Sequence, residues 1–251
     1  LLACADLSAN PNVERPDRLP EATFPTPAAL QASIDRGCAF LRKRQNPDGS
    51  WGSPQQTKGL NIFAPVPGSH RAFRLAVTAL SVSALIENKA ADSAYHPSIE
   101  RGETYLLTHL PPLRRATPVA IYNVWAHAYG IQALVRLRDL ALERSDANAS
   151  SHLERIDTLV AQQFQRLQRY ESVDGGWGYY DFRIGAKQPA SSSISFVNGT
   201  ALLALHEAKT RGLAPPEKLV KRALDATRRQ RLPDHSYLYG EYLKWKPRRG
   251  I

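Results

Sequence analysis

The sequence predicts an all-α fold of about four helical hairpins, and three observations lead to this prediction. First, four amphipathic stretches start 65, 61 and 59 residues apart along the chain of 251 residues. Second, apolar residues recur at helical spacing in these stretches and in the more apolar stretches between them. Third, no stretch shows a convincing alternation of apolar and polar residues, the pattern of a half-buried strand. A two-helix repeat of roughly 60 residues is typical of chains whose units stack on their neighbours.

The amphipathic stretches are the predicted outer helices, each with one polar face toward solvent. They are Ile34–Leu41, Ile99–Leu106, Val160–Leu167 and Leu219–Leu224. The more apolar stretches are the predicted inner helices, which are covered on more sides. They are Phe73–Ile86, Val119–Leu140 and Ser193–Ala208, with Tyr237–Trp245 as a short last member. Small residues such as Ala79, Ala133 and Ala201 let neighbouring inner helices approach closely.

Two of the outer helices end in a similar turn, which is the most specific motif of the chain. Its tryptophans, Trp51 and Trp177, are 126 positions apart, which is two repeat lengths. Asp-Gly supplies the positive φ of a tight turn, and the Trp side chain can fold back over the helix end. The residues of this structural motif are Gln45, Asp48, Gly49, Trp51, Asp174, Gly175 and Trp177. Residues 230–237 form an eroded third copy, and the second hairpin has His109-Leu110-Pro111-Pro112 instead.

The pattern Gln-x-x-Asp-Gly-x-Trp after a helix, repeated at this spacing, resembles the repeat of the prenyltransferase and squalene/oxidosqualene cyclase superfamily. The resemblance covers roughly residues 28–246. It implies an α/α toroid, in which inner helices ring a central cavity and outer helices pack around them. Because full rings of this superfamily have more than eight helices, four hairpins imply a partial or short α/α barrel. The chain is most similar to short members of the superfamily without assigned chemistry.

The resemblance does not extend to the catalytic motifs of the superfamily. Its cyclases protonate an isoprenoid with Asp-x-Asp-Asp-Thr-Ala, and the corresponding stretch here, Phe196–Ala201, keeps only Thr-Ala. Asn198 stands where the central acid would be, and an amide cannot protonate an alkene. The related zinc enzymes use Asp, Cys and His, but Cys4 and Cys38 lie outside the inner helices and no His pair has i, i+4 spacing. Residues around Cys38 also do not supply the Gly-Cys-Gly-Glu-Gln of thioester domains. We therefore expect neither a metal nor another cofactor, the catalytic residues stay unknown, and the balance is against an enzyme.

Polar and aromatic side chains at the mouths of the inner helices are the candidates for lining a cavity. In the register that aligns Thr78, Gln132 and Thr200, the position five residues earlier holds Phe73, His127 and Ser195, which would ring one level. His127 could act as an acid or base near neutral pH, but a hydrogen-bonded structural role is favoured. Asp181 could orient a polar ligand or belong to a loop that caps the barrel end. The full candidate set is Phe73, Tyr122, Trp125, His127, Tyr129, Tyr179, Asp181, Ser195 and Asn198.

The N-terminal residues predict a tether and a cell-envelope location. Residues 1–27 are rich in Pro and read as a tether or strap before a repeat domain of residues 28–251. Leu1-Leu2-Ala3-Cys4 resembles the end of a bacterial lipoprotein signal, in which the Cys is lipidated and tethers the protein to a membrane. A periplasmic or cell-envelope protein is therefore expected, and an incidental Cys in a cytoplasmic protein is the alternative. Cys4 could instead form a disulfide with Cys38, although Cys38 as a buried free thiol is slightly favoured.

Composition and charge exclude several classes of protein. An apolar content of 43% excludes a mainly disordered chain, and the longest apolar stretch, Ala76–Ile86, is too short to span a bilayer. Of the net charge of +10, the segment 211–251 carries +7, from 11 Lys and Arg against 4 Asp and Glu. Such a segment suits an acidic partner protein. Nucleic acid is not expected, because no helix-turn-helix, zinc finger or RNA-binding signature accompanies the charge.

Three functions stay open on this basis. The favoured one is a non-catalytic interaction or scaffold module, a subunit of a larger assembly or a homo-oligomer, which contacts its partner through residues 211–251 or an open inner face. The second is a protein or enzyme of the terpene cyclase or prenyltransferase type, which binds an isoprenoid or other apolar ligand. The third is a carbohydrate-active lyase on an α/α barrel that uses His127 and Asp181.

Overall fold

The computed structural model describes residues 24–53, 67–89, 91–117, 120–143, 149–180 and 193–240. In these ranges it contains α-helices, one 3₁₀ turn (η1, Ser93–Tyr95) and isolated β-bridges, but no strand. The α-helices are α1 (Pro27–Arg44), α2 (Pro67–Lys89), α3 (His96–His109), α4 (Asn123–Glu143), α5 (Ala149–Arg169), α6 (Ser195–Thr210) and α7 (Glu217–Gln230). The predicted all-α class is confirmed, and the predicted outer and inner helices fall on observed ones, with a single exception.

The exception is the short helix predicted at Tyr237–Trp245. Residues 237–240 are not helical, and the rest of that stretch lies outside the described ranges. Tyr237 forms a β-bridge with Arg231, and Gly240 forms one with Ile194. These bridges hold the chain extended as it leaves the turn after α7, so it crosses the start of α6 instead of coiling.

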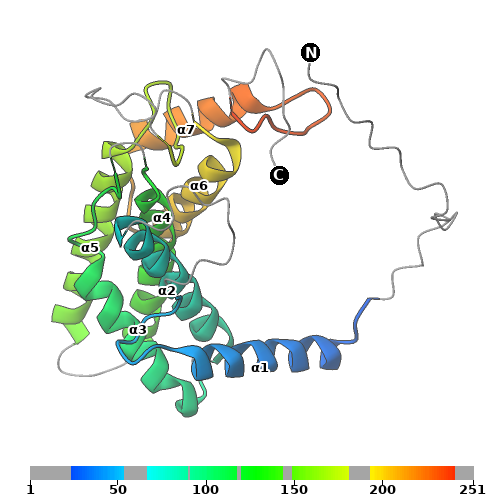
Figure 1. Cartoon of the computed structure of the whole chain (residues 1–251), viewed down its shortest axis with the longest axis vertical. Helices are drawn as coiled ribbons and strands as arrows, with labels where there is room; N and C mark the ends of the chain where they lie inside the picture. Colours follow the sequence, from blue (N-terminus) through cyan, green and yellow to red (C-terminus); the bar gives the residue numbers. More distant parts are fainter. Residues whose placement is uncertain are drawn as a thin grey trace, which may run out of the picture.

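The helices form two layers. The inner layer consists of α2, α4 and α6, which lie side by side with α4 in the middle. The outer layer packs α3 on α2, α5 on α4 and α7 on α6, while α1 packs on α2 at one end (Figure 1). Because α4 has neighbours on three sides, most of its residues are buried, whereas α5 and α7 each keep a charged face toward solvent.

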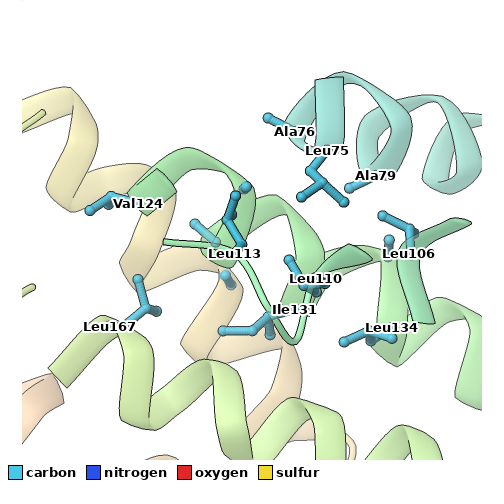
Figure 2. Close-up of a cluster of buried hydrophobic side chains, with 14 of the residues drawn as sticks. Leu75, Ala76, Ala79, Leu106, Leu110, Leu113, Val124, Ile131, Leu134 and Leu167 are labelled. Atoms are coloured by element: carbon cyan, nitrogen blue, oxygen red, sulfur yellow. The ribbon is translucent and has the colours of Figure 1, made fainter. Parts of the chain in front are cut away.

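The core lies between the two layers and is made mainly of aliphatic side chains. Figure 2 shows its central part, which draws on α2, α3, α4 and α5. The labelled residues are Leu75, Ala76, Ala79, Leu106, Leu110, Leu113, Val124, Ile131, Leu134 and Leu167. Small residues permit this packing: a Cβ added at Gly130 would lie 2.8 Å from Cδ2 of Leu110. Close packing of this kind positions the inner helices for the contacts described below.

Helix α1 packs against this core along one side only. It starts at Pro27 behind an N-cap at Thr26, whose side chain accepts a hydrogen bond from the backbone N–H of Ala29. Cys38 is its only fully buried residue and is a free thiol, whereas Leu30 and Phe40 are more than half exposed. In Figure 1, α1 and α7 lie at opposite ends of the molecule. Cys4, and with it the predicted lipidation site, lies outside the described ranges.

Candidate functional site

The chain makes the same turn after α1, after α5 and after α7. In each copy a backbone N–H near the helix end donates to the carbonyl four residues later, over 2.8 Å. The donor and acceptor pairs are Asn46 with Ser50, Ser172 with Gly176, and Leu232 with Ser236. The residue before each acceptor has a positive φ: 86° at Gly49, 94° at Gly175 and 67° at His235. The eroded third copy predicted at residues 230–237 is therefore a genuine turn of the same type.

The tryptophan of the motif covers the helix end, as predicted. The indole N–H of Trp51 donates to the carbonyl of Leu41, and that of Trp177 to the carbonyl of Leu167, each over 2.8 Å. Both carbonyls belong to the last turn of a helix, where no intrahelical donor is left. Both rings are buried. The indole N–H thus supplies a hydrogen bond to a carbonyl at the helix end, and the ring adds a large apolar side chain to the core.

The turn also binds the inner helix of its own hairpin. The backbone N–H of Trp51 donates to Oγ1 of Thr78 over 3.0 Å, and that of Trp177 donates to Oδ1 of Asn198 over 2.7 Å. Asn198 also donates to Gln230 and is fully buried. The residue aligned with a catalytic acid therefore has a structural task, and it is Asn198, not Thr200, that takes the place of Thr78 in this contact.

The turns after α1 and after α5, called the filled turns below because their tryptophan is buried, each contact the next outer helix through an arginine. Arg101 of α3 donates to Oε1 of Gln45 over 2.6 Å, and Arg222 of α7 donates to Oε1 of Glu171 over 2.7 Å. A Cβ added at Gly49 would lie 2.3 Å from the carbonyl oxygen of Arg101, and one at Gly175 would lie 2.5 Å from that of Arg222. Glycine is thus required here both by its φ and by the close approach of the next helix.

Residues 98–102 of α3, Ser-Ile-Glu-Arg-Gly, form the turn-receiving face. The carbonyl of Ser98 accepts a hydrogen bond from Gln45 over 2.9 Å. At Gly102, an added Cβ would lie 2.5 Å from Cγ2 of Val82 and 3.0 Å from the ring of Trp51, so the missing side chain makes room for both α2 and the indole. The face therefore recognises the turn at its first residue and at its tryptophan.

The same five-residue pattern recurs on α1 at residues 33–37, Ser-Ile-Asp-Arg-Gly, where the described part of the chain leaves it open. Arg36 and Gly37 are exposed, and nothing lies within 4 Å of a Cβ added at Gly37. Arg36 folds back onto Oγ of Ser33 over 2.9 Å, which keeps its guanidinium near the face. The repeat of these residues was visible in the sequence, but only the contacts of α3 reveal what the pattern binds.

His235→Gly is expected to raise the free energy of unfolding by up to about 1 kcal/mol, measured by urea unfolding. A left-handed conformation strains any residue with a Cβ, and glycine removes that strain at some cost in chain entropy. The reciprocal change Gly175→Ala should lower stability, because it adds both that strain and the contact with Arg222. A loss of stability in His235→Gly would contradict this account of the third turn.

An aromatic row runs across the start of the inner helices on the side away from α5. Its ring centroids are 4.9 Å apart between Phe73 and Tyr122, and 5.8 Å apart between Trp125 and Phe196. Most of these side chains are only partly buried. The aromatic row consists of Phe73, Tyr122, Trp125, Tyr129, Tyr179, Tyr180, Phe196 and Tyr239. Of the predicted cavity residues, the structure thus brings together Phe73, Tyr122, Trp125, Tyr129 and Tyr179.

The side of α2, α4 and α6 that carries the aromatic row is called the inner face. Further along this face the three helices carry aliphatic and charged residues. Val77, Leu80 and Leu203 are 41%, 43% and 52% exposed. Arg136 of α4 pairs with Glu87 of α2 and with Glu207 of α6, so one guanidinium links all three helices. The inner face is therefore aromatic at one end and fixed by an ion-pair network at the other.

His127 does not join the aromatic row. At about 100° per residue, Trp125 and His127 point to nearly opposite sides of α4, and His127 faces α5, where its ring stacks 6.0 Å from that of Tyr170. Its Nδ1 donates to Gln163 over 2.8 Å, and its Nε2 accepts from Asn123 over 3.2 Å. Burial, together with the charge of Arg166, lowers the pKa of His127 to about 4, against the opposing effect of the hydrogen bond that His127 donates to Gln163.

Phe73, His127 and Ser195 therefore do not line one level of a cavity as predicted, because His127 faces the outer layer. Ser195 is buried at the start of α6, where its backbone N–H donates to the carbonyl of Tyr239. Asp181 lies outside the described ranges. A neutral, enclosed His127 is a structural group, which is the favoured one of its two predicted roles.

The basic segment forms the outer edge at α7. Lys218, Lys221 and Arg228 are exposed there, whereas Arg222 and Arg229 bind backbone carbonyls of the turn after α5. Part of the predicted partner-binding charge therefore holds the last hairpin in place. The structure describes this segment only as far as residue 240.

Comparisons with known proteins add no identity. No protein-family model matches the chain, and no match was found among curated proteins or solved structures. Within the described ranges, no three His, Cys, Asp or Glu side chains gather as metal ligands would. None of the helices described here combines the length and apolar character needed to cross a bilayer.

Proposed function

We propose that the protein is a non-catalytic interaction module that binds a helix–turn unit of a partner protein on α1. The observation that carries this proposal is the open face at residues 33–37, whose pattern matches the filled turn-receiving face of α3. The pattern that binds a turn on α3 is exposed on α1, so α1 can make the same kind of contact.

We also propose that the two helical layers are an arc of the α/α toroid that the repeat resembles. The alternation of outer and inner helices supports this, as does the turn that ties each outer helix to its inner one. In an arc of this kind a further hairpin can add on the exposed side of α1.

The partner's turn is expected to carry Gln or Glu at its first position and Gly after its Asp. Arg101 contacts Gln45 and Arg222 contacts Glu171, so Arg36 can bind either side chain in the same way. Glycine is needed because any Cβ would meet the carbonyl of Arg36, as it would meet those of Arg101 and Arg222.

A second copy of this chain does not fit the open face through its own last turn. That turn carries His235 where the filled turns carry Gly49 and Gly175, and its aromatic residue is Tyr237. The imidazole-bearing Cβ would enter the space that the carbonyl of Arg36 takes. The turn that binds there is therefore expected to carry an intact Asp-Gly-x-Trp motif.

Restoring that turn provides the test. The last turn also carries Arg231 where the other two carry Gln45 and Glu171, and Arg231 would repel Arg36. The triple variant Arg231→Gln, His235→Gly, Tyr237→Trp removes this charge and converts the sequence Asp-His-Ser-Tyr into Asp-Gly-Ser-Trp, which is identical to residues 48–51. In sedimentation equilibrium we expect this variant to associate head to tail as concentration rises, and the unmodified protein not to associate by this route.

Two glycine variants on the triple-variant background identify the surface. Gly37→Leu fills the open face and should abolish the association. Gly199→Leu is the matched control, because Gly199 is also helical with nothing within 4 Å of an added Cβ, and association should persist. A triple variant that stays monomeric, or one whose association survives Gly37→Leu, would overturn the proposal.

A further inference from the structure

A cavity of about 640 Å³ lies at one end of the molecule, between α2, α3 and the loop that follows α3. Its lining includes Arg71 and Arg74 from the start of α2, and Arg114 and Arg115 from the loop. Asp48 is the one carboxylate among its lining residues. Even without Arg115, the lining therefore brings together three guanidinium groups, those of Arg71, Arg74 and Arg114, and a single carboxylate.

The carboxylate of Asp48 is already engaged by the turn after α1. Its Oδ1 accepts hydrogen bonds from the N–H and Oγ of Ser50, over 3.1 and 2.6 Å. Its Oδ2 lies 3.6 Å from Nη1 of Arg74. Partial burial opposes ionisation, but the bonds from Ser50 and the charge of Arg74 hold the pKa of Asp48 below its ordinary value. Asp48 is thus ionised at neutral pH and offsets one arginine, which leaves an excess of positive charge.

The fold brings these arginines together and holds them. Arg71 and Arg74 are three residues apart on one face of α2, and a Cβ added at Gly68, which also lines the cavity, would lie 2.8 Å from Cα of Ala116. The start of α2 therefore packs directly against the loop that carries Arg114 and Arg115. Like charges held in a concave site repel one another, and a bound anion relieves that repulsion.

Most of the remaining lining is apolar or aromatic, with His109 as a further polar side chain. Leu75, Leu113 and Tyr105 are buried and form part of the wall. The volume lies within the range of small-molecule sites, roughly 300–1,000 Å³. Such a site suits a ligand with charged oxygens at one end and a carbon skeleton at the other.

We propose that this cavity binds a small organic anion that carries at least two negative charges on oxygen, either as a phosphate or as several carboxylates. Arginine matches both groups, because its planar fork donates two parallel hydrogen bonds to a pair of oxygens. The site is separate from the open face of α1 and does not depend on the proposed docking there.

The test is calorimetric titration of the full chain with inorganic phosphate and with citrate at constant ionic strength. Saturable binding of one equivalent is expected. Binding of phosphate alone identifies a phosphorylated ligand, and binding of citrate alone a polycarboxylate, so either result supports the site. Absence of saturable binding of both probes would overturn the proposal.

Charge-removing variants distinguish binding in the cavity from a general attraction of anions to a basic protein. Arg71→Gln and Arg114→Gln, both at exposed positions that should leave the fold intact, are each expected to weaken binding about tenfold. Lys218→Gln and Lys221→Gln on α7 remove the same charge outside the cavity and should change affinity less than about twofold. Equal losses in the two pairs of variants would mean that the anion binds through diffuse charge, and the proposal would be wrong.

Discussion

Trp177→Ala is expected to lower the free energy of unfolding by about 3–5 kcal/mol, the largest effect of any single change considered for this chain. The indole is fully buried, so its removal leaves a cavity at the junction of α5, α6 and the turn. It also removes one of two hydrogen bonds to the carbonyl of Leu167 at the end of α5, which keeps only the one from the backbone N–H of Tyr170. Urea unfolding followed by circular dichroism at 222 nm measures the loss.

Two further variants divide this effect into its parts. Trp177→Phe keeps an aromatic ring but not the hydrogen bond to Leu167, so a loss of about 1–3 kcal/mol is expected. Tyr237→Ala is the matched control in the third turn, where the ring is 36% exposed, and it should cost less than about 1 kcal/mol. If Tyr237→Ala cost as much as Trp177→Ala, the tryptophan would not be the feature that closes each hairpin.

His127 is expected to make the protein about 2 kcal/mol less stable at pH 5 than at pH 7. Its pKa of about 4 in the folded protein is below the value near 6.5 of an unfolded chain. The unfolded chain therefore binds one more proton in the window between these values, so stability falls as the pH falls through it. Protonation in the fold would also place a second donor against the amide nitrogen of Asn123.

The variant His127→Gln isolates this contribution. It removes the titrating group, so its stability should change about 2 kcal/mol less between pH 7 and pH 5 than that of the unmodified protein. His206→Gln, on the exposed side of α6, is the control and should retain the full pH dependence. A His127→Gln variant with an unchanged pH dependence would show that His127 is protonated in the fold.

The helices were predictable because their signals are local. Apolar spacing located every observed α-helix, and the Asp-Gly-x-Trp motif located two turns by the need for positive φ at Gly49 and Gly175. The third turn was recognisable even with His235, since Asp234 and Ser236 keep the capping hydrogen bonds of the motif.

The candidate sites were less predictable because they depend on contacts between distant residues. The direction of His127 follows from where α5 packs on α4, which no spacing within α4 reveals. The cavity brings together arginines about 40 residues apart in the sequence. Its positive charge depends on the packing of α2 against the loop after α3, which the sequence alone does not reveal. The function of residues 33–37 required the contacts of their counterpart in α3 to be seen.

The exposure of α1 has a consequence for how tightly anything can bind there. A single helix packed along only part of its length opens easily, because isolated helices of this size are marginally stable in water. The cost of ordering the first turns of α1 would therefore offset much of the favourable free energy of binding at residues 33–37. Occupancy of that face and local folding of α1 are then one coupled equilibrium, in which a bound partner slows the exchange of the α1 amide hydrogens.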